Sequence, residues 1–471
     1  MKIPHSLRDL QHSLSQKEIT IEETLRHYLS VIDEKNPELN VFLEVFDLQA
    51  LEKAKLLDQE IQQGKFRKLT GLIVGIKDLF CFQGKTMTGG SRILENFESQ
   101  ITATAVSKME EEGAIIIGRQ NCDEFGMGSS NENSAYGPVR NQVDQQYVPG
   151  GSSGGSAVAV QSGMCMISLA SDTGGSIRQP AAFTGTIGLK PTYGRVSRFG
   201  LTAYASSFDC VGLIGNDLET IDQTLEVISG KDEQDHTTVD VSSFREDTIY
   251  DQKTTLGTLP EFINQKGIAE DIRNTYHESL HTLRKDFDIH EFEFPFSQYL
   301  LPVYYILTSA EASANLSRFD GVRYGHRASE VDSMEQLYKK TRFEAFGKEV
   351  IRRIMLGTFV LSANYHDAFY VKADKARSLI KSYLKEMFKS IDILVLPTTP
   401  STAFKLGEKT DDPVEMYLSD IFTTLASIGG FPAISLPAGK NSQGFPIGIQ
   451  LVCDEFQESR LLNFSKRITL G

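Results

Sequence analysis

The sequence predicts an α/β protein that forms one large domain around a single sheet. Between residues 71 and 118, apolar β-branched runs alternate with an amphipathic helical segment, which is typical of a sheet covered by helices. Strand-like runs return at 393–396, 433–436 and 447–452, and no linker rich in Pro, Gly or Ser separates them from the earlier runs. We therefore expect residues 1–471 to form one domain whose C-terminal segment completes the sheet.

The first third of the chain alternates between helix and strand patterns. Thr20 and Glu23 form a capping box, and apolar residues then recur at helical spacing up to Asn36-Pro37, where we expect this first helix to end. Two further helices, each closed by a glycine, and three strands are expected in the same region. The helices cover 48–63 and 104–112, and the strands cover 40–46, 71–77 and 114–118.

Two glycine-serine loops lie in the middle of the chain. The first loop, 150–156, precedes a helical run at 157–160 and a buried strand at 166–170, and the second loop, 172–176, follows that strand directly. Glycines in such loops let backbone N–H groups approach a ligand without interference from a Cβ, and successive N–H groups can hold an anion. A serine among them is therefore well placed for acyl chemistry.

The remainder of the chain, from residue 186 to about 390, begins with short strands and becomes mostly helical by pattern. Short strands are expected at 186–190 and 210–214, and the polar stretch 230–252 is expected to lie on the surface. Apolar spacing predicts an amphipathic helix at 267–285 and further helices between about 306 and 390.

Charge and cysteine content exclude several classes of protein. The chain has 48 Lys and Arg against 62 Asp and Glu, and the net charge of -14 opposes unaided binding of a polyanion such as RNA or membrane phosphate. Its five cysteines are widely spread without CxxC spacing, so neither a disulfide framework nor a structural zinc site is expected. No apolar run approaches the roughly 18 residues that a membrane span requires. We expect a soluble protein of the cytoplasm that has no metal site and does not bind a membrane.

A serine hydroxyl needs a base before it can act as a nucleophile near neutral pH. None of the nine histidines is near the serine loops in the sequence, although folding could bring one close. Lys77 ends an apolar strand, where burial would lower its pKa toward the working pH. Ser176 is the preferred nucleophile because the segment Thr173-Gly174-Gly175-Ser176 offers backbone amides for an oxyanion hole. Ser152 would relay the proton between Ser176 and Lys77.

These residues carry a resemblance to a known family. Lys77, the loop GGSSGGSA at 150–157 and the segment TGGSIRQPA at 173–181 are similar to the motif of the amidase signature family, which here covers roughly residues 70–190. The resemblance implies a central mixed β-sheet flanked by helices. It also implies a general base, a bridging serine in a cis peptide and an acyl-forming nucleophile, which match Lys77, Ser152 and Ser176 respectively.

Later segments, at about 300–455, indicate which amide is hydrolysed. Residues 304–325, 346–359 and 412–439 resemble the glutamine-hydrolysing components of tRNA-dependent amidotransferases, which belong to the same family. Free glutamine carries an α-carboxylate and an α-ammonium group, so its site needs one fixed cation and one fixed anion. The resemblance places these charges on Arg353 and Asp420, and it implies further substrate contacts at Tyr304, Tyr305, Met127, Gly128 and Ser129.

The same resemblance implies partners for the chain. Glutamine would be hydrolysed to glutamate and ammonia, and a second protein, the B component, would use ATP and Mg²⁺ to transfer that ammonia to Glu-tRNA(Gln), Asp-tRNA(Asn) or both. A small third protein, the C component, would complete a heterotrimer. Misacylated tRNA would be bound through the complex, and this chain itself would need no cofactor.

Other interpretations of the motifs remain open. A stand-alone amidase acting on another small amide would carry the same signature residues. Overlapping GxSxG patterns at 150–155 fit the nucleophile elbow of an esterase with a histidine base, although Pro149 stands where the elbow needs a strand. His277 and His281 belong to an HExxH pattern without the third ligand of a zinc protease. A non-catalytic scaffold is a further alternative, but such a relic would be expected to have lost the serine nucleophile.

Overall fold

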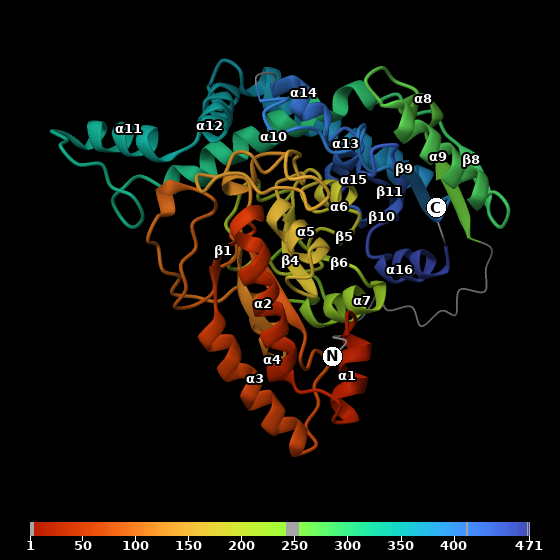
Figure 1. The fold of residues 1–471 in the computed structure, drawn as a ribbon. Coiled ribbons are helices and arrows are strands. Elements are labelled where there is room, and N and C mark those ends of the chain that lie inside the picture. Colours follow the sequence, from red (N-terminus) through yellow and green to blue (C-terminus); the bar gives the residue numbers. More distant parts are fainter. Residues whose placement is uncertain (1–3, 242–253, 411–412, 469, 471) are drawn as a thin grey trace.

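The computed structural model describes residues 4–241, 254–410, 413–468 and 470 (Figure 1). Eleven strands of this described part form one sheet, in the order β1-β3-β2-β4-β6-β5-β10-β11-β9-β7-β8. Pairing is parallel on both sides of β2 and of β7 and antiparallel at the other pairs, so the sheet is mixed. The strands are β1 Phe42–Val45, β2 Ile73–Lys77, β3 Ile115–Gln120, β4 Ile167–Asp172, β5 Ile187–Lys190, β6 Cys210–Gly215, β7 Thr255–Thr258, β8 Asp288–Glu291, β9 Ile393–Pro397, β10 Ala433–Lys440 and β11 Pro446–Val452.

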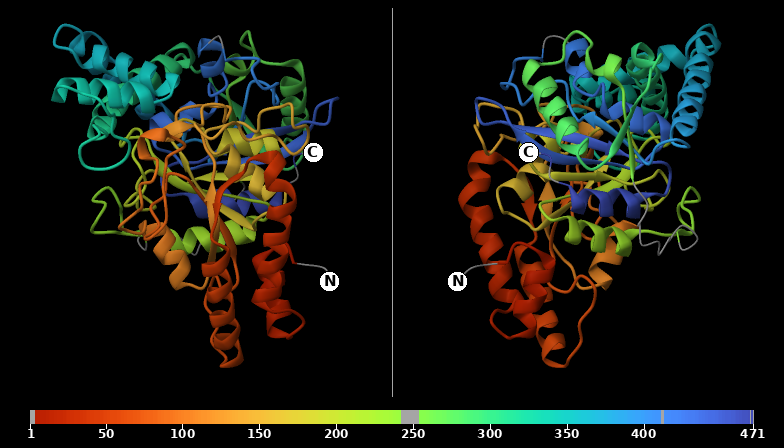
Figure 2. Two further views of the ribbon diagram at one scale, coloured as in Figure 1. Left: turned by 60° about the vertical axis from the view of Figure 1, so that its left-hand side comes forward. Right: turned by 90° about the vertical axis from the view of Figure 1, so that its right-hand side faces the viewer.

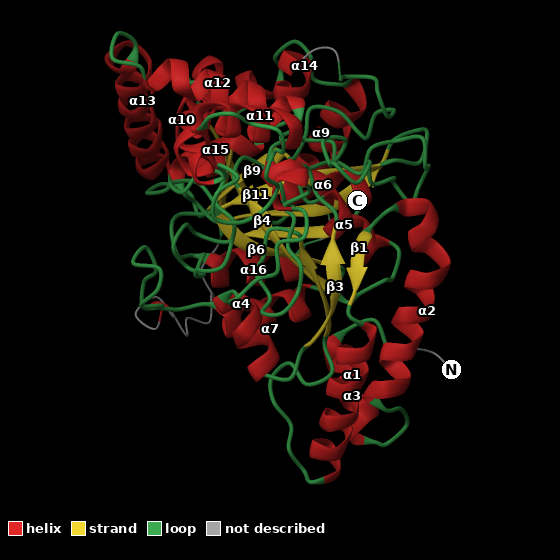
Figure 3. Cartoon of the chain, turned by 90° about the vertical axis from the view of Figure 1, so that its left-hand side faces the viewer, coloured by secondary structure: helices red, strands yellow, loops and turns green. Residues whose placement is uncertain are grey.

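Helices flank this sheet, as Figure 3 shows in red against yellow strands. Helices α1 to α4 form one end of the molecule and α10 to α15 the opposite end, an arrangement visible in both views of Figure 2. The helices are α1 Leu7–Ser15, α2 Ile21–Leu39, α3 Asp47–Gln62, α4 Thr104–Glu111, α5 Gly154–Gln161, α6 Arg178–Thr184, α7 Leu218–Ile228, α8 Pro260–Ile263, α9 Glu270–Leu283, α10 Leu300–Asn315, α11 Met334–Ala345, α12 Lys348–Leu361, α13 His366–Met387, α14 Pro413–Leu418, α15 Thr423–Gly429 and α16 Glu458–Arg467.

The predicted fold class, α/β with a mixed sheet flanked by helices, is confirmed. Strands expected near the start and near the end of the chain share the same sheet, because β5 pairs with β10. The assignment of residues 1–471 to a single domain stays a prediction.

Two predicted helix ends were wrong. The first helix continues through Pro37 to Leu39, because Asn40 adopts a left-handed conformation there with φ 55° and donates its amide to the Asn36 carbonyl. The Asn36 side chain accepts the amide of Val41 at 2.9 Å, which helps to close the helix. Helix α5 begins at Gly154, three residues before the expected start, directly after the Ser152-containing loop.

Two strands were missed, and one surface prediction holds only in part. β7 and β8 have four residues each, too few for their alternation to be distinguished from a loop. Within the stretch 230–252, most of residues 231–241 are exposed, but Asp235 is buried and pairs with Arg198 at 3.1 Å. Residues 242–252 lie outside the described part.

The topology brings the two glycine-serine loops to one edge of the sheet. β2 and β4 are parallel neighbours, with Val74 opposite Ile167 and Ile76 opposite Leu169. Their C-terminal ends therefore meet, which places Lys77 beside the start of the loop 172–176. Helix α5 packs against both strands, so the loop that precedes it, 150–153, reaches the same edge.

Candidate active site

Lys77 is fully buried at the end of β2 and is surrounded by serine hydroxyls. Its Nζ lies 2.7 Å from Ser152 Oγ, 2.8 Å from Ser153 Oγ and 3.1 Å from Ser171 Oγ. Three hydroxyl oxygens can accept all three N–H groups of a charged lysine. When the lysine is neutral, its lone pair can accept the proton of one hydroxyl instead, so this cluster suits reversible proton transfer.

Burial lowers the pKa of Lys77 to about 8. The nearby Cys122 and Asp123 act in the opposite direction and keep the pKa from falling further. At pH 7, about one enzyme molecule in ten then carries a neutral Lys77. That fraction of the enzyme has the base ready to accept a proton.

The loop that carries Ser152 is held by buried polar side chains. The Gly151-Ser152 peptide is cis, as the family resemblance implied. The Gly151 amide donates to Gln179 Oε1 at 2.8 Å, and the Asp123 amide donates to the Ser152 carbonyl at 3.1 Å. A Cβ on Gly151 would collide with the Asp123 carboxylate, so this position needs a glycine.

A buried ion pair fixes the second loop. Asp172, the last residue of β4, accepts two hydrogen bonds from the Arg178 guanidinium at 2.9 and 3.0 Å and one from the Ile177 amide at 3.1 Å. Burial alone would raise the pKa of Asp172, but Arg178 holds it below its usual value. Arg178 also donates to the Thr423 carbonyl at 2.8 Å, which ties the loop that contains Ser176 to α15. Both ends of the loop 173–177 are therefore rigid.

The backbone amides of the segment 173–176 are available to a ligand. None of the four donates a hydrogen bond to another described residue. Two glycines allow the loop to lie this close to its neighbours. A Cβ on Gly174 would lie 2.5 Å from the Tyr304 hydroxyl, and one on Gly175, which has φ 146°, would collide with the Thr423 side chain. These four amides are therefore free of partners among the described residues, and their role as an oxyanion hole stays a prediction.

Ser176 differs from the three serines around Lys77 because its hydroxyl is not engaged in a hydrogen bond within the described part of the chain. Its side chain is 8% exposed, and its Oγ makes no hydrogen bond to another described residue. The Ser153 amide donates to the Ser176 carbonyl at 3.1 Å and joins the two loops. The predicted relay would require a hydrogen bond from Ser176 Oγ to Ser152 Oγ, which the described residues do not show, so the relay also stays a prediction.

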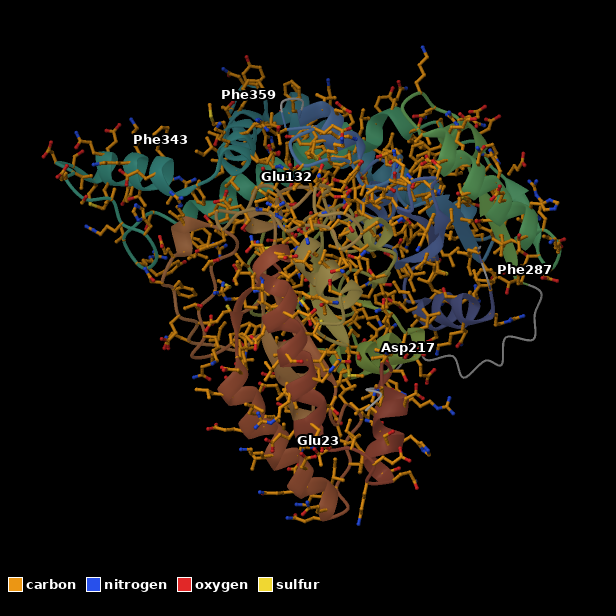
Figure 4. The ribbon with its side chains drawn as sticks, viewed as in Figure 1. Glu23, Glu132, Asp217, Phe287, Phe343 and Phe359 are labelled. Carbon is orange, nitrogen blue, oxygen red and sulfur yellow. The ribbon has the colours of Figure 1, made fainter. Side chains whose placement is uncertain are left out.

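Arg353 lines a cavity of about 290 Å³ between the loop 128–133 and α12. Glu132, labelled in Figure 4, lines the same cavity. The guanidinium of Arg353 donates to Glu349 Oε1 at 2.8 Å and to the Tyr204 hydroxyl at 2.5 Å. The Tyr305 ring lies 5.0 Å from its guanidinium carbon, which adds a cation–π contact. These contacts hold the Arg353 guanidinium in place, and none of them involves Asp420.

Asp420 supplies the opposite charge near the same loop. Its Oδ2 accepts the Ser129 hydroxyl at 2.6 Å, and the residue is 7% exposed. Burial raises the pKa of Asp420 to about 7, while the Ser129 hydrogen bond and the charge of Arg353 lower it. Thr423 Oγ1 donates both to the Asp420 carbonyl at 3.1 Å and to the Gly174 carbonyl at 2.7 Å. One threonine thus bridges the Asp420 turn and the nucleophile loop.

The remaining predicted substrate residues surround these groups. Tyr304 and Tyr305 are buried on α10, and their rings lie 5.0 Å apart. Gly128 lines the cavity, whereas Met127 is fully buried beneath it. The structure therefore brings all the predicted catalytic and substrate-binding positions into one region, although Met127 has no exposed surface to offer a ligand.

The competing motifs do not form sites. Residues 149–153 are a loop rather than the strand that a nucleophile elbow requires, and no histidine makes a hydrogen bond to Ser152 or Ser176 in the described chain. His277 and His281 lie on the exposed face of α9. The described residues contain no group of three His, Cys, Asp or Glu side chains that could hold a metal ion.

Sequence reasoning missed several residues that hold the site. Asp123, Ser171, Gln179 and Glu349 are buried polar residues for which no role was predicted, although Gln179 and Glu349 lie in the segments 173–181 and 346–359 that carry the family resemblance. Only their position near predicted site elements could have drawn attention to two of them. Asp123 follows β3, and Gln179 lies three residues after Ser176. Gln179 bonds Ser129 and Gly151, which are 50 and 28 residues away, whereas Glu349 pairs with Arg353 four residues further along α12.

Comparison with known proteins identifies the family. The family model described as "Amidase" matches residues 23–462. The chain belongs to the amidase family.

Several relatives of this amidase carry the same name. A protein of Chlorobium limicola, named as the A subunit of glutamyl-tRNA(Gln) amidotransferase, is 44% identical over 469 residues, with 98% of each chain covered. A protein of the same name from Oceanobacillus iheyensis is 46% identical over 459 residues, covering 97% of this chain and 94% of its own. The crystal structure of the protein of that name from Thermotoga maritima is 37% identical, covers 94% of this chain and 92% of its own, and superposes with a TM-score of 0.75.

No helix in the described part of the chain is both long enough and apolar enough to cross a membrane. The expected cytoplasmic location of this amidase stays a prediction.

The pH dependence of amide hydrolysis is expected to follow Lys77. The lysine accepts a proton only when neutral, so kcat/KM should rise as pH increases through about 8 and level off above it. Initial rates between pH 6 and 9.5 on the folded enzyme would measure this. A rise centred near 6.5, the ordinary pKa of histidine, would contradict the assignment of the base.

Proposed function

We propose that this amidase is the glutamine-hydrolysing component of a tRNA-dependent amidotransferase. The observation that supports it most strongly is the combination of a buried base, Lys77, with two fixed opposite charges, Arg353 and Asp420, around one nucleophile loop. A small amide without charges would not need that pair. Free glutamine, with one carboxylate and one ammonium at its α-carbon, matches both.

The reaction begins with attack by Ser176. Its Oγ adds to the side-chain amide carbon of glutamine as Ser152 takes the proton and passes one of its own to neutral Lys77. The amides of the segment 173–176 stabilise the negative oxygen of the tetrahedral intermediate. The intermediate collapses when the proton returns to the leaving nitrogen, which releases ammonia and leaves a glutamyl ester on Ser176.

Water completes the cycle along the same proton path. Neutral Lys77 and Ser152 take a proton from the attacking water, and the new tetrahedral intermediate expels Ser176 Oγ, which recovers its proton. Glutamate leaves, and the enzyme returns to its first state. Meanwhile Arg353 holds the α-carboxylate and Asp420 the α-ammonium, so the amide carbon stays aligned with Ser176.

The partners of the chain are part of the proposal. Curated relatives are named as the A subunit of glutamyl-tRNA(Gln) amidotransferases, a name that describes one part of a larger assembly. We infer that the ammonia passes to the B component, which uses ATP and Mg²⁺ to amidate misacylated tRNA, and that the C component joins both. The net charge of -14 is consistent with tRNA contacts on another protein of the assembly.

Substrate selectivity tests the proposed substrate. The kcat/KM for glutamine should exceed that for propionamide and asparagine by about a hundredfold or more, because glutamine alone places both charged groups and its amide carbon in register. Comparable values for uncharged amides would favour a stand-alone amidase instead. The assay is ammonia release by the assembled protein under matched conditions.

Replacing Arg353 is expected to weaken glutamine binding. Arg353→Ala removes the cation that faces the α-carboxylate, so KM should rise about 30- to 100-fold while kcat changes less. Arg353→Lys is the matched variant, since it keeps the charge but loses the fork held by Glu349 and Tyr204, and its KM should lie between the two. An unchanged KM in Arg353→Ala would exclude this residue from glutamine binding.

A further inference from the structure

A continuous chain of buried hydrogen bonds runs from the anion of the substrate pocket to the catalytic base. It begins at Asp420, whose Oδ2 accepts the Ser129 hydroxyl at 2.6 Å. The carbonyl of the same Ser129 accepts Gln179 Nε2 at 2.8 Å. Gln179 therefore contacts the backbone of the residue whose side chain holds the proposed ammonium ligand.

The chain continues from Gln179 to the relay serine. Gln179 Oε1 accepts the Gly151 amide at 2.8 Å. Gly151 is joined to Ser152 by the next peptide bond, and Ser152 Oγ lies 2.7 Å from Lys77 Nζ. Four hydrogen bonds and one peptide bond thus connect Asp420 to Lys77.

Gln179 is enclosed and has both ends of its amide in use. Its side chain is fully buried, as is that of Ser152, and Ser129 is 2% exposed. A Cβ on Gly150 would collide with Gln179 Oε1, so the first loop approaches the glutamine closely because a glycine stands there. A buried amide with one donor and one acceptor contact has a defined orientation, and a shift at one contact is transmitted to the other.

The position of Gln179 links three elements of the mechanism. It lies on α6, three residues after Ser176, so the backbone joins it directly to the loop that carries the proposed nucleophile. It contacts the recognition loop through Ser129 and the relay loop through Gly151. Every residue of this series of hydrogen bonds is buried, so no water-exposed group lies between the contacts.

From this arrangement we propose that Gln179 is a positioning residue that couples occupation of the Asp420 site to the orientation of Ser152. The inference rests on the proposed function, because it takes Asp420 as the ligand of the glutamine α-ammonium. When the ammonium binds Asp420, the carboxylate and the Ser129 hydroxyl adjust together. The Ser129 backbone and Gln179 transmit this adjustment to the Gly151 amide, which sets Ser152 between Lys77 and Ser176.

A double-mutant cycle on kcat for glutamine tests the coupling. Ser129→Ala breaks the chain at its first hydrogen bond, and Gln179→Met breaks the next two with a side chain of similar length. Each single variant should lower kcat about tenfold, and the double variant should lower it about tenfold as well, because a chain that is already broken transmits nothing further.

Independent losses would overturn the proposal. If Gln179 only supports the fold, the two effects should multiply to about a hundredfold in the double variant. Unchanged kcat in Gln179→Met would overturn it equally. Gln161→Met is the matched control, since Gln161 also bridges two backbone groups, the Gln142 amide and the Thr184 carbonyl, outside this chain. It should keep kcat within about twofold.

Folding and the proposed function are checked separately. Thermal unfolding of each variant shows whether it is folded, and if Gln179→Met is not, Gln179→Glu replaces it in the cycle. That variant keeps an acceptor for the Gly151 amide but loses the donor to the Ser129 carbonyl.

All rates are measured in the assembled amidotransferase. A wild-type assembly without glutaminase activity would refute the proposed function, whereas an active one with multiplicative losses would refute only the coupling.

Discussion

Ser176→Ala is expected to abolish ammonia release from glutamine, with kcat reduced by about 10⁴-fold or more. Alanine cannot form the acyl ester, and the neighbouring hydroxyls of Ser152 and Ser153 are already bonded to Lys77. The variant should fold and unfold like the wild type, because Ser176 Oγ makes no hydrogen bond to another described residue. The measurement is ammonia release at saturating glutamine, together with thermal unfolding of both proteins.

Ser162→Ala is a matched control for that experiment. Ser162 follows α5, and its hydroxyl donates to the Gln142 side chain outside the site. Its activity should stay within about twofold of wild type. Substantial ammonia release from a folded Ser176→Ala protein would move the nucleophile to another residue.

The second large effect is expected for Lys77→Met. This substitution keeps a long apolar stem in the buried position and removes the base, so kcat should fall by about 10³- to 10⁴-fold. Lys77→Arg should not restore the rate, since a guanidinium stays protonated throughout the accessible pH range. Rates at pH 8.5, where the wild-type lysine is mostly neutral, give the clearest comparison.

Lys190 offers a control in the same kind of environment. It also ends a strand of the central sheet, is 1% exposed and has its pKa lowered by burial, but its Nζ donates to the Pro191 carbonyl instead of a serine. Lys190→Met should therefore retain kcat within a few-fold, whatever its effect on stability. Equal losses of kcat in both lysine variants would show that the Lys77 effect is structural.

The core of the site could be predicted from the sequence because its chemistry is local. Two glycine-serine loops on either side of a strand, and a lysine that ends another strand, are visible in short segments of the chain. Parallel pairing of β2 and β4 then brings them together. The substrate pocket is different, since Arg353 and Asp420 lie far from these loops in sequence, and family resemblance alone located them.

Other features could not be predicted for physical reasons. Gln179 acts through hydrogen bonds to Ser129 and Gly151, which are 50 and 28 residues away in the chain, and no periodicity marks such contacts. The end of α2 depends on the left-handed backbone of Asn40, which outweighs the presence of Pro37. β7 and β8 are strands because they extend an existing sheet beyond β9, and their sequences show little β pattern of their own.

Ammonia release from glutamine, measured for the chain alone and with its candidate partner proteins, ATP, Mg²⁺ and misacylated tRNA, tests the central claim most directly. The proposed function predicts strong stimulation by the complete mixture, with transfer of the ammonia to the tRNA and loss of both activities in Ser176→Ala. Glutamine turnover that is absent, or present and unchanged by the partners, would contradict the claim and indicate an independent amidase acting on its own substrate.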